Sequence, residues 1–248
     1  MDGPTIYVLS VVFVATLIRS TFGFGEALVA VPLLAFRIPI EVSVPLAVML
    51  SATVAGVVVV QDWRKIHVRS AGWMIGATLF GIPLGLLLLT RVNPHYAKAI
   101  LGVLILLFSI YSLAGRRLIE LKNDSRAGLL VCGFLAGVLG GAYGLNGPPL
   151  VIYAAMRRWS AAHFRATLQA YFLPASLITL VGYALAGLLN RTITYYYLIS
   201  LPPAVAAIFL GRVLNHRLRG DSFLKYVYLG LAGIGALLLT QGVHPMGR

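Results

Sequence analysis

The sequence predicts an all-α fold, that of a polytopic helical membrane protein, and three observations support this prediction. The 248-residue chain is 59% hydrophobic and only 11% charged, with a mean hydropathy of +0.90. A water-soluble domain of this size would not need so many apolar residues for its core. The apolar residues form continuous runs without polar alternation, which predicts helices and disfavours the strands of a membrane barrel.

Eight of these runs are long enough to cross a hydrocarbon core of roughly 30 Å as helices. They lie at about residues 5–22, 42–60, 70–90, 96–115, 127–143, 164–186, 193–212 and 222–241. Two further runs, at about 24–36 and 147–158, are too short to span, and each directly follows a glycine-rich break. Each is expected to be a half-helix or the returning arm of a re-entrant hairpin. The connections are short, so a single transmembrane domain is expected over residues 1–248.

The first break runs from Arg19 to Glu26 and contains Gly23 and Gly25. Arg19 and Glu26 are the only charged residues well inside a long apolar segment. Burying a charge in hydrocarbon costs several kcal/mol, so each should have a partner or a watery cavity. Two interpretations stay open: a neutralising pair that holds the hairpin shut, or an arginine that attracts an anion beside a glutamate that is its counter-charge or a protonatable coupling group.

The second break runs from Gly140 to Pro149 and contains Tyr143, Gly144 and Gly147. Asn146 can cap a helix, and Pro148 falls where proline is tolerated, in the first helical turn. A helix that begins here inside the membrane would direct its positive end toward the bilayer centre and attract an anion. Gly25 and Glu26 begin the matching half-helix, so both ends are expected to converge on one point. The alternative is that the breaks serve only tight helix packing.

Loop charges predict how often each broken helix crosses the membrane. If each hairpin returns the chain to the side from which it came, fourteen basic residues lie on one side and five on the other; if each break crosses once, the sides carry nine and ten. The positive-inside rule favours the first arrangement, with both termini outside the cytoplasm. The fourteen are Arg64, Lys65, Arg69, Arg116, Arg117, Lys122, Arg126, Arg157, Arg158, Arg165, Arg212, Arg217, Arg219 and Lys225.

This arrangement predicts two inverted repeats, at about residues 5–115 and 127–241, each with a broken hairpin and three spanning helices. Each half makes an odd number of crossings, which inverts the second half relative to the first. A shift of 121 residues superposes Gly23 on Gly144, although residue identity is otherwise weak. After the second hairpin, Arg165 and Gln169 share one face of a helix that could point toward it.

Composition and motifs also disfavour other classes of function. The net charge of +13 comes from basic residues in short loops, which predicts orientation in the membrane and contact with anionic lipids but no nucleic-acid partner. The five histidines are scattered without metal-ligand spacing, and no metal or cofactor is expected. Among the seven acidic residues only Glu26 lies deep, and no serine-elbow or phosphate-loop motif is present, so the chain is not predicted to be an enzyme.

Three motifs resemble those of the TauE/SafE sulfite exporter family, also called the 4-toluene sulfonate uptake permease family: Thr21–Leu34, Gly144–Pro149 and Phe164–Gln169. The resemblance covers essentially the whole chain. It implies a prokaryotic inner-membrane permease for small sulfur-containing anions or organosulfonates, whose glycine and proline motifs form the transport site. Many members carry a third glycine where this chain has Glu26, which implies a subgroup with a different substrate or coupling.

We therefore predict a multi-pass secondary transporter of a small anion in the bacterial inner membrane, working by alternating access. A coupling proton or ion is a candidate partner, and the oligomeric state is left open, with a homodimer as one option. The alternatives are a non-transporting scaffold or partner subunit, and an uptake permease for a carboxylate or another small metabolite. The predicted substrate-binding residues are Arg19, Gly23, Gly25, Glu26, Tyr143, Gly144, Asn146, Gly147, Pro148, Arg165 and Gln169.

Overall fold

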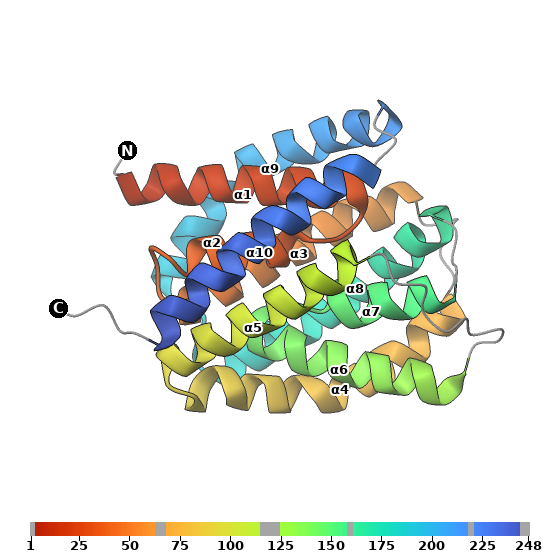
Figure 1. The fold of residues 1–248 in the computed structure, drawn as a ribbon, viewed down its shortest axis with the longest axis horizontal. Helices are drawn as coiled ribbons and strands as arrows, with labels where there is room; N and C mark the ends of the chain where they lie inside the picture. The colour runs from red at the N-terminus through yellow and green to blue at the C-terminus, as the bar shows by residue number, and fades with distance from the viewer. Residues whose placement is uncertain (1–2, 63–67, 115–124, 158–160, 218–220, 244–248) are drawn as a thin grey trace.

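The computed structural model describes residues 3–62, 68–114, 125–157, 161–217 and 221–243, and within these ranges the chain forms ten α-helices and no strand (Figure 1). The first half contains α1 (Gly3–Phe22), α2 (Glu26–Leu34), α3 (Ile40–Asp62), α4 (Val68–Arg91) and α5 (Pro94–Leu113). The second half contains α6 (Arg126–Tyr143), α7 (Gly147–Met156), α8 (Ala161–Leu185), α9 (Arg191–Arg217) and α10 (Asp221–Val243).

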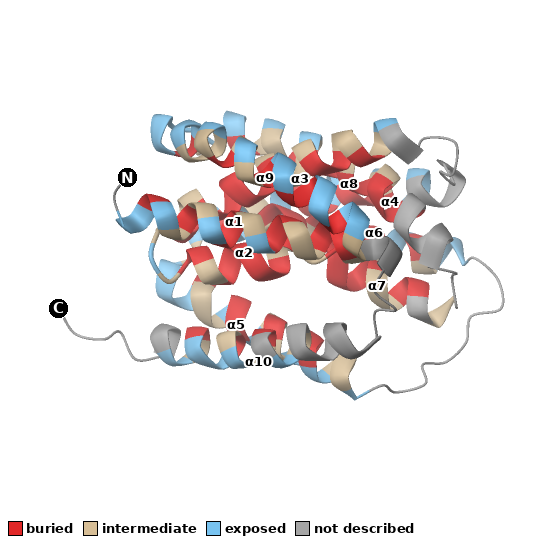
Figure 2. Cartoon of the chain, turned by 90° about the horizontal axis from the view of Figure 1, so that it is seen from above, coloured by how far each residue is buried: buried red, intermediate tan, exposed pale blue. Residues whose placement is uncertain are grey.

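The helices have the lengths and surfaces of a multi-pass membrane protein. Seven of them are long and apolar enough to cross a bilayer, and the described apolar part of α10 covers Leu231–Thr240. Large apolar side chains point outward: Val60 is 78% exposed, Phe80 75% and Leu185 85%. Figure 2 shows the buried residues gathered along the inner helices α1, α2 and α3. Such an apolar exterior suits lipid rather than water, so the predicted helical membrane fold is confirmed.

The two halves run through the bundle in opposite directions. In Figure 1, α1 and α3 both begin at the end where α10 finishes, so α1 and α2 together return the chain to its starting side. Helix α5 finishes at the opposite end, where α6 and α8 begin. Each half therefore has a broken hairpin and then three long helices, and the second half starts where the first half stops.

Helix packing repeats between the halves. Helix α4 packs against α6 in the way that α9 packs against α1, while α3 pairs with α8 and α5 with α10. Exchanging each helix for the one five places along the chain leaves these pairings unchanged, as a two-fold repeat requires. The repeat limits near residues 5–115 and 127–241 stay a prediction.

Small residues let the paired helices approach closely. A Cβ atom added at Gly81 of α4 would lie 2.8 Å from the backbone nitrogen of Val138, and one added at Gly137 of α6 would lie 2.6 Å from the carbonyl oxygen of Thr78. Close backbone contact of this kind is a main source of helix association in lipid, where apolar side chains gain little by leaving the solvent.

Replacing Gly81 with alanine is therefore expected to separate α4 from α6 and lower stability by about 1–3 kcal/mol, the usual range for overpacking. Gly76→Ala is the matched control, because it lies on the same helix with no atom within 4 Å of an added Cβ. Thermal unfolding of the purified proteins in detergent measures the difference. Equal melting temperatures for the two variants would contradict the close contact.

Candidate functional site

Both breaks are built on glycines with left-handed backbone angles. Helix α1 ends at Phe22, and α2 begins only after Gly23 (φ 86°) and Gly25 (φ 98°). Helix α6 ends in the same way at Gly144 (φ 67°), whose N–H donates to the carbonyl of Gly140 at 2.8 Å. Residues with a Cβ rarely adopt these angles, so the glycines determine where each helix stops.

Asn146 fills the interior of the second break. Its side chain lies against Gly140, where an added Cβ would be 2.5 Å from the Asn146 Oδ1 atom. The Asn146 side chain also interacts with the Tyr171 hydroxyl, which pairs with Thr78 Oγ1 at 2.7 Å. The second break is therefore held by an uncharged side chain packed on a glycine.

The first break is held by a buried ion pair. Arg19 Nη1 donates to Glu26 Oε2 at 2.6 Å, and Thr16 Oγ1 donates to Glu26 Oε1 at 3.0 Å. The side chains of Arg19 and Glu26 are only 3% and 2% exposed. The short distance across the glycine turn gives each charge the partner that burial demands. Glu26 also lies in the first turn of α2, where a negative charge is favoured.

Arg19 also contacts side chains of α3 and α8. Its Nη1 atom also donates to Ser51 Oγ of α3 at 2.5 Å, and Nη2 donates to Gln169 Oε1 of α8 at 3.3 Å. The guanidinium lies over the Phe172 ring, 5.1 Å from its centroid. Its Nε atom is buried and has no hydrogen-bond partner among the described residues. The Nε–H group is therefore available to a further acceptor.

Gln169 connects the two halves at the first break. Its Nε2 atom donates to the carbonyl of Gly23 at 2.9 Å, while its Oε1 atom accepts from Arg19. One amide side chain of α8 thus bonds both to a backbone carbonyl of the turn and to the arginine that precedes it.

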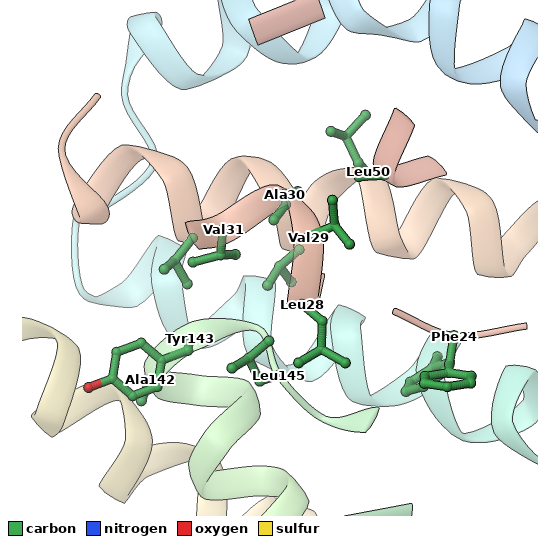
Figure 3. Packing of buried hydrophobic residues seen from close by; sticks show 14 of the residues in the cluster. Phe24, Leu28, Val29, Ala30, Val31, Leu50, Ala142, Tyr143 and Leu145 are labelled. Atoms are coloured by element: carbon green, nitrogen blue, oxygen red, sulfur yellow. The ribbon is translucent and has the colours of Figure 1, made fainter. Parts of the chain in front are cut away.

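A small cavity lies between the breaks. Its walls come from Arg19, Phe24–Leu28 and Ser51 of the first half and from residues 144–148 and Phe172 of the second. Its volume is about 20 Å³, which is roughly room for one water molecule. Figure 3 shows Leu28 of α2 beside Leu145 of the second break. The N-terminal ends of α2 and α7 therefore meet at one cavity.

The lining residues correspond between the halves. Adding 121 to a position in the first half gives the matching position in the second, and five such pairs line the cavity. They are Phe24 and Leu145, Gly25 and Asn146, Glu26 and Gly147, Ala27 and Pro148, and Ser51 and Phe172. The charged pair has no counterpart, because the positions that match Arg19 and Glu26 are Gly140 and Gly147.

Most of the predicted site residues come together here. Those that line the cavity are Arg19, Gly25, Glu26, Gly144, Asn146, Gly147 and Pro148. Gly23 and Gln169 are bound to each other just behind the lining. Tyr143 is buried at the end of α6 but does not line the cavity. Arg165 lies in α8, and its side chain falls outside the described residues.

Three contributors were missed by the sequence analysis: Thr16, Ser51 and Phe172. Thr16 lies one helical turn before Arg19 and shares its face, so helical spacing would have found it. Ser51 and Phe172 lie in apolar helices remote in sequence, and only the 121-residue correspondence relates them. Phe172 lies one helical turn after Gln169 and shares its face, whereas no local pattern indicates that Ser51 faces the break.

Comparison with known proteins decides the family. A family model described as "Sulfite exporter TauE/SafE" matches residues 8–239 of this chain. The chain belongs to the TauE/SafE sulfite exporter family. It is similar to the "Probable sulfite/organosulfonate exporter TauE" of Cupriavidus necator, with 25% identity over 186 residues that cover 73% of this chain and 70% of that protein. No solved structure matches it. As a TauE/SafE member, the chain is a multi-pass membrane transporter and not an enzyme.

The Arg19–Glu26 pair predicts strongly non-additive changes in stability. Arg19→Met or Glu26→Gln alone leaves one buried charge uncompensated, which is expected to cost about 3 kcal/mol or more. The double variant removes both charges, so its loss of stability should be clearly smaller than the sum of the two single losses. Thermal unfolding of the four proteins in detergent tests this coupling, and strictly additive losses would contradict it.

Proposed function

We propose that this TauE/SafE protein is a secondary transporter of a small sulfur-containing anion: sulfite, another sulfur oxyanion or an organosulfonate. The relative from Cupriavidus necator is named as an exporter of sulfite and organosulfonates, which supports this substrate class. In our proposal the anion binds between the two breaks, at the Arg19 guanidinium and the positive end of α7.

The buried arginine on the cavity wall is the observation that carries the proposal. Arg19 is 3% exposed, has a free Nε donor, and faces the first turn of α7 across the cavity. A guanidinium suits an oxyanion because its N–H groups form a planar fork. Helix α7 adds the positive end of its dipole without an acidic residue in its first turn.

Alternating access between the inverted halves is the mechanism we propose. The cavity lies where corresponding positions of both halves meet, so motion of one half against the other could open it to either side in turn. Its volume of about 20 Å³ is too small for a sulfonate group, so in our proposal the cavity widens before the anion binds. Contacts such as Gln169 with Gly23 would then change as the gate at the first break opens.

We further propose that the protein lies in the bacterial inner membrane, with both termini outside the cytoplasm and with membrane lipids and the small anion as its partners. The described basic residues support this orientation. Arg69, Arg126 and Arg217 lie at the start of α4, the start of α6 and the end of α9, all at the end of the bundle where α5 finishes, whereas Arg91 and Arg191 lie at the opposite end (Figure 1).

Anion flux into liposomes tests the transport proposal. Purified protein is expected to move radiolabelled sulfite or a sulfonate, and Arg19→Ala should reduce the initial rate by at least tenfold because the anion loses its cationic partner. Arg91→Ala is the matched control, since it removes an exposed arginine at the end of α4. Size-exclusion profiles report folded yield in parallel. A normal rate in Arg19→Ala, or no flux in the unaltered protein, would contradict the proposal.

Cysteine accessibility tests the orientation. In a background with Cys132→Ala, single cysteines replacing Arg37 and Arg157 are expected to react with a membrane-impermeant reagent from opposite sides. Both residues follow a broken hairpin, one in each half, and inverted halves place them on opposite faces. Labelling of the two positions from the same side would exclude the inverted orientation.

A further inference from the structure

The Glu26 carboxylate occupies the position that a substrate anion would need. Its two oxygens accept from the Arg19 guanidinium at 2.6 Å and from the Thr16 hydroxyl at 3.0 Å. These are the kinds of donors that bind an oxyanion. The carboxylate lies on the wall of the same small cavity, so it competes directly for Arg19 with any anion that enters.

A glycine break of this kind can be held without an ion pair. The second break makes an equivalent turn with Gly140 and Gly147 at the corresponding positions, and it is held by Asn146 packed on Gly140. Two buried charges are expensive when a neutral arrangement serves the same turn. The acid at position 26 therefore calls for a function beyond holding the hairpin together.

The net charge of the groups around the cavity determines whether an anion can bind there. With Arg19 protonated and Glu26 ionised, the pair is neutral, and a bound anion would leave a net negative charge buried in a low-dielectric interior. A proton taken up by Glu26 removes this cost, because the neutral acid no longer needs the guanidinium. Arg19 can then turn its Nη donors, together with its free Nε, toward the anion.

Among the described residues that line the cavity, Glu26 is the one carboxylate that can take up a proton. Of the described lining residues, α1 contributes Arg19, α3 contributes Ser51, and α8 contributes the Phe172 ring. The turn before α7 contributes Asn146, and α5 and α10 contribute no lining residue. Tyr228 of α10 lies at a neighbouring pocket against Phe24 and Leu28. Arg19 is thus the one charged group at the cavity besides Glu26, among the residues that the structure describes.

We propose that Glu26 takes up one proton for each substrate anion that binds Arg19, so that the protein is a proton–anion symporter. This inference rests on the proposed transport function. In each cycle a proton from water binds a Glu26 carboxylate oxygen, the anion replaces the carboxylate on Arg19, and both leave on the other side. For a monovalent anion the cycle is electrically neutral and is driven by the pH difference, so an inward proton gradient drives uptake of the anion.

Methanesulfonate is a suitable probe, because it stays a monoanion over the whole pH range in which proteins are stable. Its dissociation constant for the purified protein should rise about tenfold per pH unit once Glu26 is ionised, the slope for one linked proton. An indicator dye in weakly buffered solution should record about one proton taken up per anion bound. For Glu26→Gln, the dissociation constant for methanesulfonate should change less than twofold over the same pH range, and binding should take up no proton. Glu41→Gln, which removes a carboxylate from the first turn of α3, should behave as the unaltered protein.

Flux in liposomes completes the test. An imposed pH gradient should drive methanesulfonate against its own gradient in the unaltered protein, whereas Glu26→Gln should only equilibrate it. Methanesulfonate flux that is the same with and without a pH gradient, together with no proton uptake on binding, would overturn the coupling while leaving the transport proposal intact. Absence of any binding or flux of methanesulfonate, sulfite and thiosulfate would overturn both. Proton uptake by the unaltered protein decides the question even where Glu26→Gln fails to fold.

Discussion

One buried arginine is the constraint on which the site depends. A guanidinium does not lose its proton in a protein, so Arg19 must be neutralised by its surroundings wherever the bilayer places it. The structure meets this need with Glu26, reached across a two-glycine turn, and with acceptors from Ser51 and Gln169 on two further helices. Four helices, three from the first half and α8 from the second, are thereby held around one charge.

The internal repeat explains why that charge lies at the middle of the fold. Helices α3 and α8 pair with each other as symmetry mates, and both supply residues to the cavity. The two broken hairpins meet there with their half-helix ends facing one cavity. A transporter built this way can present one site to both sides of the membrane while its halves exchange conformations.

The two halves differ most at the charged residues of the first break. Position for position, the first break carries Arg19 and Glu26 where the second carries Gly140 and Gly147. The neutral break leaves the positive end of α7 without an acidic partner in its first turn, and the charged break supplies an arginine opposite it. Duplicated architecture and unlike side chains together place a buried ion pair opposite an uncharged helix end, and the proposed binding of an anion and a proton rests on this arrangement.

The packing of α4 against α6 supports this arrangement, and Thr78 of α4 also bonds to Tyr171, which interacts with Asn146. Helices α4 and α6 approach through glycines until their backbones touch, and large apolar side chains such as Phe80 face outward. In lipid, such close contact replaces the hydrophobic burial that holds soluble proteins together.

The sequence by itself determined the number and order of the helices, the two breaks, and the need of Arg19 and Glu26 for partners. These features follow from local properties: run length, glycine content, loop charge and the cost of an isolated charge in hydrocarbon. Only the tertiary structure decided that Ser51 joins the site, that Tyr143 does not line it, and that Gln169 bonds to Gly23. Those contacts depend on how helices remote in sequence rotate and pack, and no local pattern in an almost uniformly apolar chain encodes that rotation.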